Sequence, residues 1–381
     1  MIRIVDVETS VYRYPLATPV QTSFGIMNDR PMIVTRLTSA EGITGWGEIW
    51  CNFPNVGAEH RARLVQHVLA PLLMSGQHEN AEAGFDHLTR ATWVLGLQTG
   101  EQGPLAQSIA GLEIALADIE GKLKNLPIWK LFGGTTNAVP AYASGINPTN
   151  PQATVERAIR EGFDAFKLKI GFGSDRDLEN LRSLRDLIGP DSDLMVDANQ
   201  AWNIEQAHQM LVPLAAFNLQ WLEEPIAADR PQEEWQRLRK MASMPLAAGE
   251  NIYRQDQFDA VVDADILGVV QPDLAKWGGL SKTIPLARAI RASGTRYCPH
   301  YLGGGIGLVA SAHALAAAGG DGMLEVDINP NPLRTEFAGE LFSHQSDEKD
   351  NTGPKMAYLG DDAGLGYTPN LDALAEFKVQ F

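Results

Sequence analysis

The sequence has few cysteines and no long hydrophobic run. Cys51 and Cys298 are the only two cysteines in 381 residues, which excludes a framework of disulfide bonds and fits a reducing compartment. The start of the chain carries Arg3, Asp6 and Glu8, where a secretory signal needs an uninterrupted apolar segment. No stretch reaches the roughly 18 uncharged apolar residues of a membrane span. We therefore expect a cytoplasmic protein.

Basic residues are also in short supply. The chain has 31 Lys and Arg against 47 Asp and Glu, which gives a formal net charge of −16 and an isoelectric point near 4.9. Such a chain repels nucleic acids and anionic membranes, so we expect neither as a partner. The 44% hydrophobic and 20% charged residues are typical of a globular protein and exclude a largely disordered one. A small anionic substrate can still bind where local cations or a metal reverse the field.

Residues 1–125 are predicted to form a small α+β domain. Residues 2–12 alternate like a strand, and residues 32–37 and 44–49 flank a Ser-Ala-Glu-Gly turn, which predicts a hairpin. Helical periodicity then covers residues 60–74, 81–94 and 107–124. Strands followed by helices favour an α+β fold. The segment NLPIWKLFGG, residues 125–134, breaks this pattern and is the expected boundary.

From residue 138 onwards, short apolar runs alternate with helical segments. The eight runs are VPAYAS, FDAFKLKI, DLMVDA, LQWLEE, MPLAAGE, ILGVVQPD, TRYCPH and GMLEV. This alternation over about 200 residues predicts a (β/α)8 type of barrel. No clean helix follows the eighth run. We therefore assign residues 126–350 to a barrel domain and residues 351–381 to a segment that returns to the first domain.

Charged residues end seven of the eight predicted strands. They are Lys167 and Lys169, Asp197, Glu223 and Glu224, Glu250, Asp273, His300 and Glu325. From Lys169 onwards the steps are 28, 26, 27, 23, 27 and 25 residues, each the size of one βα unit. Parallel strands are buried on both faces, so charges belong at their ends. Since the carboxyl ends of barrel strands meet on one face, these residues should converge there.

Asp197, Glu223 and Glu250 come from three consecutive strands. Crowded carboxylates repel one another unless a cation lies between them. Ligands that are all oxygen suit a hard ion, so the residues predict a Mg²⁺ site; the alternative is three separate salt bridges. The side chain of Glu224 should point the opposite way from that of Glu223, so we expect Glu224 to support the site rather than bind the metal.

Two further pairs are candidates for acid–base chemistry. Lys167 and Lys169 share one strand face, and their repulsion beside a metal should lower the pKa of one of them; the alternative is a solvated basic strand end. Asp273 and His300 end neighbouring strands, so the carboxylate can fix the histidine tautomer and leave its other nitrogen free for a proton. The alternative for His300 is a histidine satisfied within the core.

Two other features have a structural interpretation that we favour. Lys276 and Trp277 are expected to pack or bridge within the barrel. Residues 303–305 are three glycines ahead of a predicted helix and could cradle a phosphate group. We favour a tight turn that lets the loop after His300 clear the site.

Taken together, the motifs resemble the mandelate racemase subgroup of the enolase superfamily, in the mandelate racemase/muconate lactonizing enzyme family. They are KLK at 167–169, VDAN at 196–199, EEP at 223–225, GEN at 249–251, QPDLAKWGG at 271–279 and PHYL at 299–302. The segment ALADIEGKLKNLPIWKLFGG is similar to the domain junction of that family. The resemblance covers nearly the whole chain. It implies a modified TIM barrel, (β/α)7β, closed by an α+β capping domain made from both termini.

The resemblance also implies roles for the residues at the strand ends. Asp197, Glu223 and Glu250 would bind Mg²⁺. Lys169 would be one acid–base group, and His300, supported by Asp273, would be the other. A lysine base occupies the position of Asp273 in the muconate-lactonizing and dipeptide-epimerase branches, so the resemblance implies a Lys/His mechanism here.

Substrate contacts are implied in the same way. Lys167 would hold the substrate carboxylate and depress the pKa of Lys169, Glu325 would hydrogen-bond the same carboxylate, and Asn199 would lie beside the metal. The loops 16–30 and 50–56 would close over the barrel and bring Arg30 and Trp50 to the substrate. These loops also contain the polar residues Gln21, Thr22, Asn28 and Asn52.

The reaction implied is removal of the proton α to a carboxylate, with the metal and lysines stabilising the charge. If the substrate has a β-hydroxyl, His300 can protonate it as it leaves, which makes the enzyme a lyase that dehydrates a sugar acid to a 2-keto-3-deoxy acid. Otherwise His300 can reprotonate the opposite face, as in a racemase or epimerase of a 2-hydroxy or amino acid. Dehydration is our first hypothesis, and a homo-oligomer is expected.

Two other classes fit the sequence less well. A zinc amidohydrolase usually needs a His-x-His pair on its first barrel strand, and the first run here reads AYASG. A binding protein that kept the fold without catalysis would be expected to have lost a metal ligand or a base, and each of these is present in the sequence.

Overall fold

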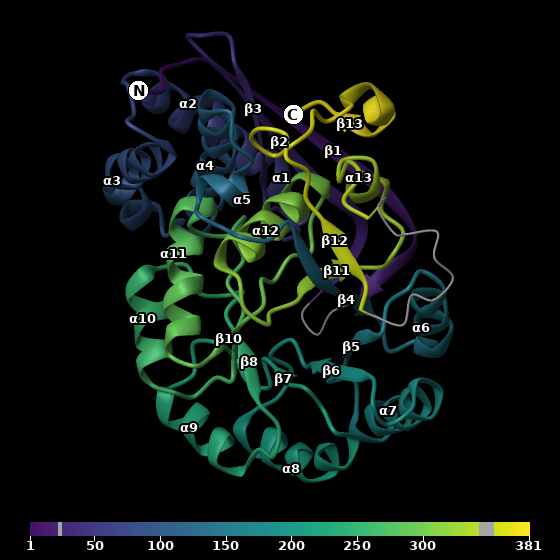
Figure 1. Ribbon diagram of the computed structural model, residues 1–381. Coiled ribbons are helices and arrows are strands. Elements are labelled where there is room, and N and C mark those ends of the chain that lie inside the picture. Colours follow the sequence, from purple (N-terminus) through teal and green to yellow (C-terminus); the bar gives the residue numbers. More distant parts are fainter. Residues whose placement is uncertain (22–24, 343–353) are drawn as a thin grey trace.

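The computed structural model describes residues 1–21, 25–342 and 354–381. Figure 1 shows a barrel of strands surrounded by helices, with a cap above it that contains both ends of the chain. Chain order explains this layout, because the cap is built from the first part of the sequence and is completed by the last residues.

The cap contains an antiparallel sheet in the order β13-β1-β2-β3. Its strands are β1 (Ile4–Gln21), β2 (Ile26–Ser39), β3 (Thr44–Ile49) and β13 (Lys378–Val379). The predicted hairpin is the β2–β3 pair. Strand β1 runs beyond the predicted alternation because its pairing with β2 shifts register between Pro15 and Val20, which accommodates proline in a strand.

Helices pack on this sheet. They are α1 (Gly57–Leu64), a π-helix at Val65–Leu69, α2 (Ala70–Met74), α3 (Ala81–Thr99), α4 (Gln102–Lys124) and the short α5 (Ile128–Leu131). Helix α4 lies directly against β3. A Cβ atom on Gly47 would lie 2.0 Å from the carbonyl oxygen of Gly111, so only glycine allows this approach. The tight contact fixes the position of β3 relative to α4.

Eight parallel strands form the barrel sheet, in the order β10-β9-β8-β7-β6-β5-β4-β11. They are β4 (Ala138–Ile146), β5 (Ala165–Lys169), β6 (Asp193–Asp197), β7 (Leu222–Glu223), β8 (Leu246–Ala248), β9 (Val269–Val270), β10 (Arg296–Tyr297) and β11 (Leu324–Asp327). One buried cluster takes a residue from or beside each strand: Tyr142, Ala165, Met195, Trp221, Ala247, Val269, Cys298 and Met323. These side chains pack together as a core inside the barrel.

Helices surround the barrel. They are α6 (Pro151–Arg160), α7 (Ser174–Ile188), α8 (Ile204–Leu214) with a 3-10 turn at Ala215–Phe217, α9 (Gln232–Met241), α10 (Gln255–Asp263), α11 (Gly279–Ala292) and α12 (Gly305–Ala318). After β11 only the short α13 (Pro332–Thr335) is found before residue 343. The fold is therefore a (β/α)7β barrel with an N-terminal α+β cap, as the sequence predicted.

The C-terminal segment contacts both parts of the molecule. Strand β12 (Met356–Tyr358) pairs antiparallel with β4 of the barrel. A 3-10 helix at Leu371–Phe377 then leads to β13, which pairs with β1 of the cap. The domain limits 1–125, 126–350 and 351–381 stay a prediction.

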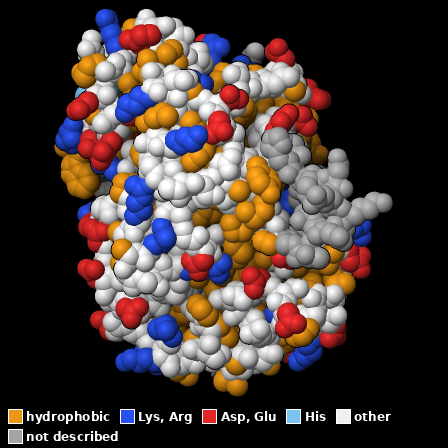
Figure 2. Space-filling view, in the orientation of Figure 1, with side chains coloured by type: hydrophobic (Ala, Val, Ile, Leu, Met, Phe, Trp, Pro, Cys, Tyr) orange, Lys and Arg blue, Asp and Glu red, His pale blue; other side chains and the backbone are white. Residues whose placement is uncertain are grey.

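The surface in Figure 2 carries acidic and basic side chains interspersed over the face shown, so the net charge of −16 is not gathered into one area of that face. Among the described residues, no helix combines the length and the apolar character needed to cross a membrane.

Candidate active site

The residues predicted to end the strands lie together at the mouth of the barrel. Lys167 Nζ is 2.7 Å from both Glu223 Oε2 and Glu325 Oε1, and His300 Nε2 is 2.8 Å from Glu250 Oε2. These contacts join strands β5, β7 and β11 with the residues that follow β8 and β10. Four of these side chains are at most 4% exposed and Glu250 is 12% exposed, so the charges balance one another mainly directly rather than through water.

The two lysines of β5 have different surroundings. Lys167 lies between Glu223 and Glu325; burial alone lowers its pKa, but these two carboxylates outweigh burial and raise the pKa well above its usual value. Lys167 is therefore a fixed cation. Lys169 Nζ instead donates a 2.6 Å hydrogen bond to Asn199 Oδ1 and lies 3.6 Å from Asp197 Oδ2. Asn199 also holds Asp197, through its backbone N–H at 2.7 Å and its side-chain amide at 2.9 Å.

His300 is held on both sides of its ring. Its Nδ1 is 2.8 Å from Asp273 Oδ2, and its Nε2 faces Glu250. The Asp273 carboxylate is itself fixed by the backbone N–H groups of Ala275 and Lys276. Burial lowers the pKa of His300, but Glu250, Glu325 and Asp273 together raise it well above its ordinary value. The histidine therefore holds a proton in this arrangement of charges.

The three predicted metal ligands are each turned towards a nearby donor. Glu223 Oε2 accepts hydrogen bonds from Lys167, from Trp221 Nε1 at 3.1 Å and from Gln271 Nε2 at 2.8 Å. Glu250 Oε2 is 2.9 Å from Lys276 Nζ. In the described part of the chain, no three His, Cys, Asp or Glu side chains are already arranged around a single point. The strand-end acids are thus neighbours whose charges are balanced by amines and the imidazole.

Glu224 changes this balance. Its φ of +39° breaks the alternation of the strand, and its side chain is buried near Glu250 and Asp197 instead of pointing away from them. Burial and these two negative charges raise the pKa of Glu224 well above its usual value. Its Oε2 atom has no hydrogen-bond partner among the described residues. A surplus of buried carboxylate oxygen is what a divalent cation would relieve, so the residues fit Mg²⁺.

A cavity of about 510 Å³ opens onto these groups. Lys169, Asn199, Glu250 and His300 line it from the barrel, while Lys167, Asp197, Glu223, Asp273 and Glu325 lie behind that wall. The cap contributes the opposite wall, made of Val20, Met27, Arg30, Trp50, Asn52 and Phe53. Of the other residues expected there, Asn28 is exposed and does not line the cavity, and Gln21 and Thr22 lie outside the described side chains.

Trp50 and Lys276 join the cap to the barrel across this cavity. Lys276 Nζ lies 4.6 Å from the centre of the Trp50 ring, close enough for a cation–π contact, and it also pairs with Glu250. Nearby, the Asn52 side-chain amide donates to the carbonyl oxygen of Leu302 at 2.7 Å. The expectation that Lys276 bridges within the barrel therefore missed its contact with the cap. The position of Lys276 three residues after Asp273 in the sequence did not predict a contact with the cap.

Arg30 lines the cavity with its charge already paired. Its Nη2 is 2.5 Å from Asp327 Oδ2, and the side chain is only 4% exposed. Burial raises the pKa of Asp327, but Arg30 and Arg334 outweigh that effect and lower it, so this acid is ionised. The pair links β2 of the cap to the end of β11.

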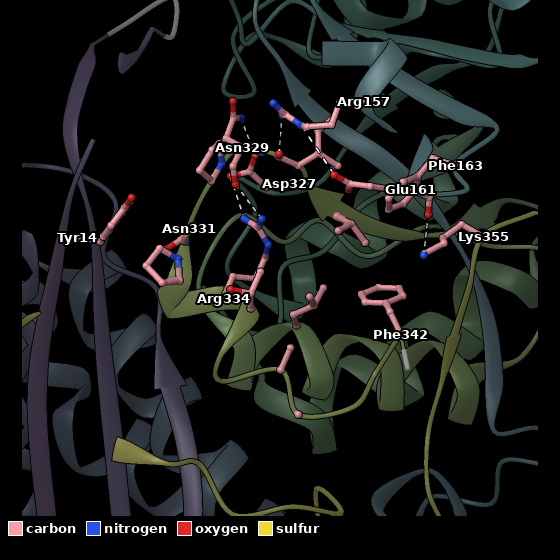
Figure 3. A pocket seen from close by; sticks show the side chains of 18 of the residues that line it. Tyr14, Arg157, Glu161, Phe163, Asp327, Asn329, Asn331, Arg334, Phe342 and Lys355 are labelled. Atoms are coloured by element: carbon pink, nitrogen blue, oxygen red, sulfur yellow. Dashed lines mark hydrogen bonds and ion pairs between the residues drawn. The ribbon is translucent and has the colours of Figure 1, made fainter. Parts of the chain in front are cut away.

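A larger cavity, of about 870 Å³, lies on the other side of this ion pair. Figure 3 shows Arg334, Asp327 and Asn329 on one side of it and Phe163, Phe342 and Lys355 on the other. Its lining includes Asp327 and Arg334, and the barrel-mouth lysines and His300 are not part of it. The smaller cavity is therefore the candidate active site.

The glycine-rich turn after His300 binds a carboxyl group of the cap. Glu48, on β3, accepts a 2.5 Å hydrogen bond from Gly304 N–H and a 2.9 Å hydrogen bond from Gly307 N–H, at the start of α12. Burial raises the pKa of Glu48 to about 7, against the opposing hydrogen bonds. This helix N-terminus thus holds a carboxyl group of the protein itself in the place where a phosphate group was considered.

Comparison with known families decides what this arrangement is. Residues 151–373 match the family described as "Enolase C-terminal domain-like", and residues 4–133 match "Mandelate racemase / muconate lactonizing enzyme, N-terminal domain". The chain belongs to this family of the enolase superfamily. Members of the superfamily use Mg²⁺, and a racemase structure from Streptomyces coelicolor A3(2), 26% identical over the whole of both chains with a TM-score of 0.83, contains bound magnesium.

Other relatives include both lyases and isomerases. A mandelate racemase/muconate lactonizing enzyme structure from Bordetella bronchiseptica RB50 is 47% identical, with a TM-score of 0.92 over 98% of this chain and 99% of that one. A D-galactarolactone cycloisomerase from Agrobacterium fabrum is 29% identical over 99% of both chains. An arabinonate dehydratase from Saccharolobus solfataricus is 30% identical over 92% of both. The comparisons therefore support an enzyme that processes sugar acids and leave the reaction open.

Proposed function

We propose that this protein is a Mg²⁺-dependent sugar-acid dehydratase. The observation that carries the proposal is one cavity lined by both Lys169 and His300, with Glu250 and Asn199 between the barrel and the cap. Two groups able to carry a proton and facing one space are what removal of an α-proton and loss of a β-hydroxyl require. The dehydratases among the relatives support this choice.

Asp197, Glu223 and Glu250 would hold the metal ion. Bound there, Mg²⁺ supplies positive charge where the substrate carboxylate becomes more negative. Glu224 is the further carboxylate near Asp197 and Glu250, and we propose that it keeps these ligands in place. Lys276 and His300 balance Glu250 in the structure described here.

The chain's own residues then carry out the proton transfers. Lys169, in its neutral form, takes the proton from the α-carbon of the substrate. Lys167 neutralises the charge of the substrate carboxylate. Glu325 is a hydrogen-bond partner of Lys167, and Asn199 positions Lys169. His300 gives its proton to the β-hydroxyl, which leaves as water while the C–O bond breaks. The enol that results rearranges to a 2-keto-3-deoxy acid.

Asp273 has a supporting part in this scheme. It holds Nδ1 of His300 and leaves Nε2 to face the cavity side of the ring, where Glu250 lies. The carboxylate favours the protonated imidazole that the leaving hydroxyl needs.

The experiment is a screen of sugar acids with Mg²⁺, scored by formation of a 2-keto acid. We expect turnover of at least one member and loss of turnover after chelation. Exchange of the α-hydrogen with deuterated solvent, without 2-keto acid from any member, would contradict dehydration.

Racemization or epimerization is the second candidate. It is favoured by the same pair of groups, Lys169 and His300, and by a relative named N-succinyl-L-Arg/Lys racemase from Bacillus cereus, which is 26% identical over 77% of this chain. In that case His300 returns a proton to the α-carbon from the other face, and no water is lost.

A further inference from the structure

The positive charges on the cavity wall are already matched by acids. The cations among the described lining residues are Arg30, Lys169, Lys276 and His300, whose ring lies 2.8 Å from both Asp273 and Glu250. Lys276 pairs with Glu250 at 2.9 Å, and Lys169 lies 3.6 Å from Asp197. Both of these lysines lie at the end of the cavity where the reaction is proposed. Arg30 is the cation of the cap wall, so its partner decides the charge at that wall.

Asp327 is the nearest acid to Arg30 and is held in place by several groups. Arg30 Nη2 lies 2.5 Å from one carboxylate oxygen, while Arg334 Nη1 is 3.7 Å from the same oxygen. The other oxygen accepts hydrogen bonds from the backbone and side-chain N–H groups of Asn329, at 3.0 and 2.6 Å. Figure 3 shows Arg334 and Asn329 on the side of the larger cavity. Arg30 therefore already forms an internal ion pair through its Nη2 atom.

The rest of the cap wall is mainly apolar. Val20, Met27, Trp50 and Phe53 line it, with the amide of Asn52 among them, and Leu302 lines the cavity from the barrel loop that follows His300. A hydroxylated, uncharged group can be accommodated by such a wall, whereas an anion would lose its hydration without gaining a counter-charge.

The other usual place for a second anion is also taken. The N–H groups at the start of α12 are bound by both carboxylate oxygens of Glu48. A Cβ atom on Gly304 would lie 2.9 Å from one of these oxygens, which shows how closely the carboxylate fills the turn. A phosphate group would have to displace a buried side chain of the cap.

We propose that the substrate carries a single negative charge, on the carboxylate next to the reacting carbon, and an uncharged hydroxylated tail against the cap. The substrate class is thus the monocarboxylic sugar acids, including their anhydro forms, rather than dicarboxylic or phosphorylated sugar acids. This inference rests on the proposed function for the identity of the reacting end. Two observations support it: the ion pair between Arg30 and Asp327, and the hydrogen bonds that Glu48 accepts at the start of α12.

The test uses pairs of sugar acids that differ only at the tail. D-galactonate and D-galactarate share a carbon skeleton and differ by a hydroxymethyl group or a second carboxylate, and gluconate and 6-phosphogluconate form a second pair. For the full-length protein with Mg²⁺, we measure protection against thermal unfolding and, separately, 2-keto acid formation. We expect the monocarboxylate of a pair to bind at least about a hundredfold more tightly, which is the scale of discrimination by one unpaired polar group.

Binding and turnover separate the two proposals. Equal or tighter binding of the dicarboxylate or phosphorylated member overturns the inference. Preferred binding of the monocarboxylate without 2-keto acid formation supports the inference and contradicts dehydration alone. Protection by neither member of either pair overturns both the inference and the proposed function.

A gain of dicarboxylate binding gives a sharper test, since misfolding cannot produce it. Asp327→Asn removes the partner of Arg30, and Leu302→Lys adds a cation to the wall without touching that ion pair. In each variant we expect the preference for the monocarboxylate to fall by about tenfold or more, as expected for a new charge pair in a partly buried site. Leu302→Met is the matched control and should keep the preference. An unchanged preference in a folded Leu302→Lys protein overturns the inference.

Discussion

Two groups of buried acids in this molecule have different partners. At the barrel mouth, Glu250 and Glu325 face amines and the imidazole; burial raises their pKa values, but these positive charges outweigh it and lower them. Between the cap and the barrel, Glu48 and Glu113 accept hydrogen bonds from backbone N–H groups and hydroxyls, and burial raises their pKa values to about 7. Glu250 and Glu325 are thus kept ionised, while Glu48 and Glu113 are kept close to neutral.

The second region forms a regular arrangement. Glu48 binds the start of α12, and Glu113, on α4, accepts hydrogen bonds from Leu280 and Ser281 N–H at 2.5 and 2.9 Å, at the start of α11. These helices follow Asp273 and His300, which come just after β9 and β10. Full counter-charges keep Glu250 and Glu325 ionised, while the partial charges of helix N-termini suffice to hold two domains together. The cap therefore contacts the barrel directly behind Asp273 and His300.

Disrupting the barrel mouth should have the largest effect. Asp197→Asn or Glu250→Gln should give folded proteins whose kcat falls by about a thousandfold or more, since a predicted ligand of the charge-stabilising ion is lost. Chelation of the native enzyme should abolish turnover, and added Mg²⁺ should restore it. Circular dichroism checks the fold, and full activity in metal-free protein would contradict the site.

His300→Asn should come next, with product formation lowered by roughly a hundredfold or more. Lys169 remains able to take the α-proton, so the variant should still exchange the α-hydrogen of substrate with deuterated water, as measured by NMR. His67→Asn, at an exposed position on the cap, is the control and should behave like the native enzyme. Normal dehydration by His300→Asn would make His300 a structural residue.

The cap–barrel contact predicts an effect of pH on stability. The pKa of Glu48 is raised from 4.5 to about 7, so its contribution to the free energy of unfolding is complete below pH 4.5 and is lost as pH rises through 7. For this fully buried group the change is roughly 3 kcal/mol. Tyr301, Asp273, Cys51 and the N–H groups of α12 face this carboxyl group.

The measurement is urea unfolding of the native protein and of Glu48→Gln between pH 5 and 8. The stability difference between the two should shrink as pH rises, because the native protein loses the contribution and the variant has no such group to titrate. Glu205→Gln, an exposed change on α8, serves as the control. A difference that is constant with pH would show that Glu48 does not titrate in this range.

Trp50→Leu should have the smallest effect, because Trp50 touches both regions without belonging to either group of acids. It removes the ring that faces Lys276. A contact of this kind contributes about 1 kcal/mol, so we expect KM to rise by up to about tenfold with kcat nearly unchanged. A large fall in kcat would assign Trp50 to the chemistry itself.

The repeating part of the structure could be predicted from the sequence. Eight apolar runs predicted the strands, and charged residues at regular steps from Lys169 to Glu325 predicted their common face, because a strand with two buried sides can carry charge only at its end. The predicted runs were longer than the strands: β7 contains only Leu222–Glu223. The residues that flank β7 still bond to its neighbouring strands, since Val196 N–H donates to the carbonyl oxygen of Trp221 and Glu224 N–H donates to that of Ala247.

Two features of the site could not be predicted from the sequence: an unusual backbone conformation and an ion pair between residues far apart in the chain. The alternation rule placed Glu224 away from the site, and its left-handed backbone brings it back towards Asp197 and Glu250. Arg30 and Asp327 are 297 residues apart, and no local pattern marks such a pair. Without that partner, the charge of Arg30 could only be read as available to a substrate.

The pairing of β13 with β1 has a consequence for how the chain is made. Residues 378–379 form the last strand of a sheet whose other strands lie within the first 49 residues. During synthesis, the edge of β1 at Val11 and Tyr12 therefore stays uncovered until residues 378–379 have been made, and an uncovered edge can pair with another chain. Synthesis of residues 378–379, more than 300 residues after β3, is thus the step that protects this part of the cap sheet from aggregation.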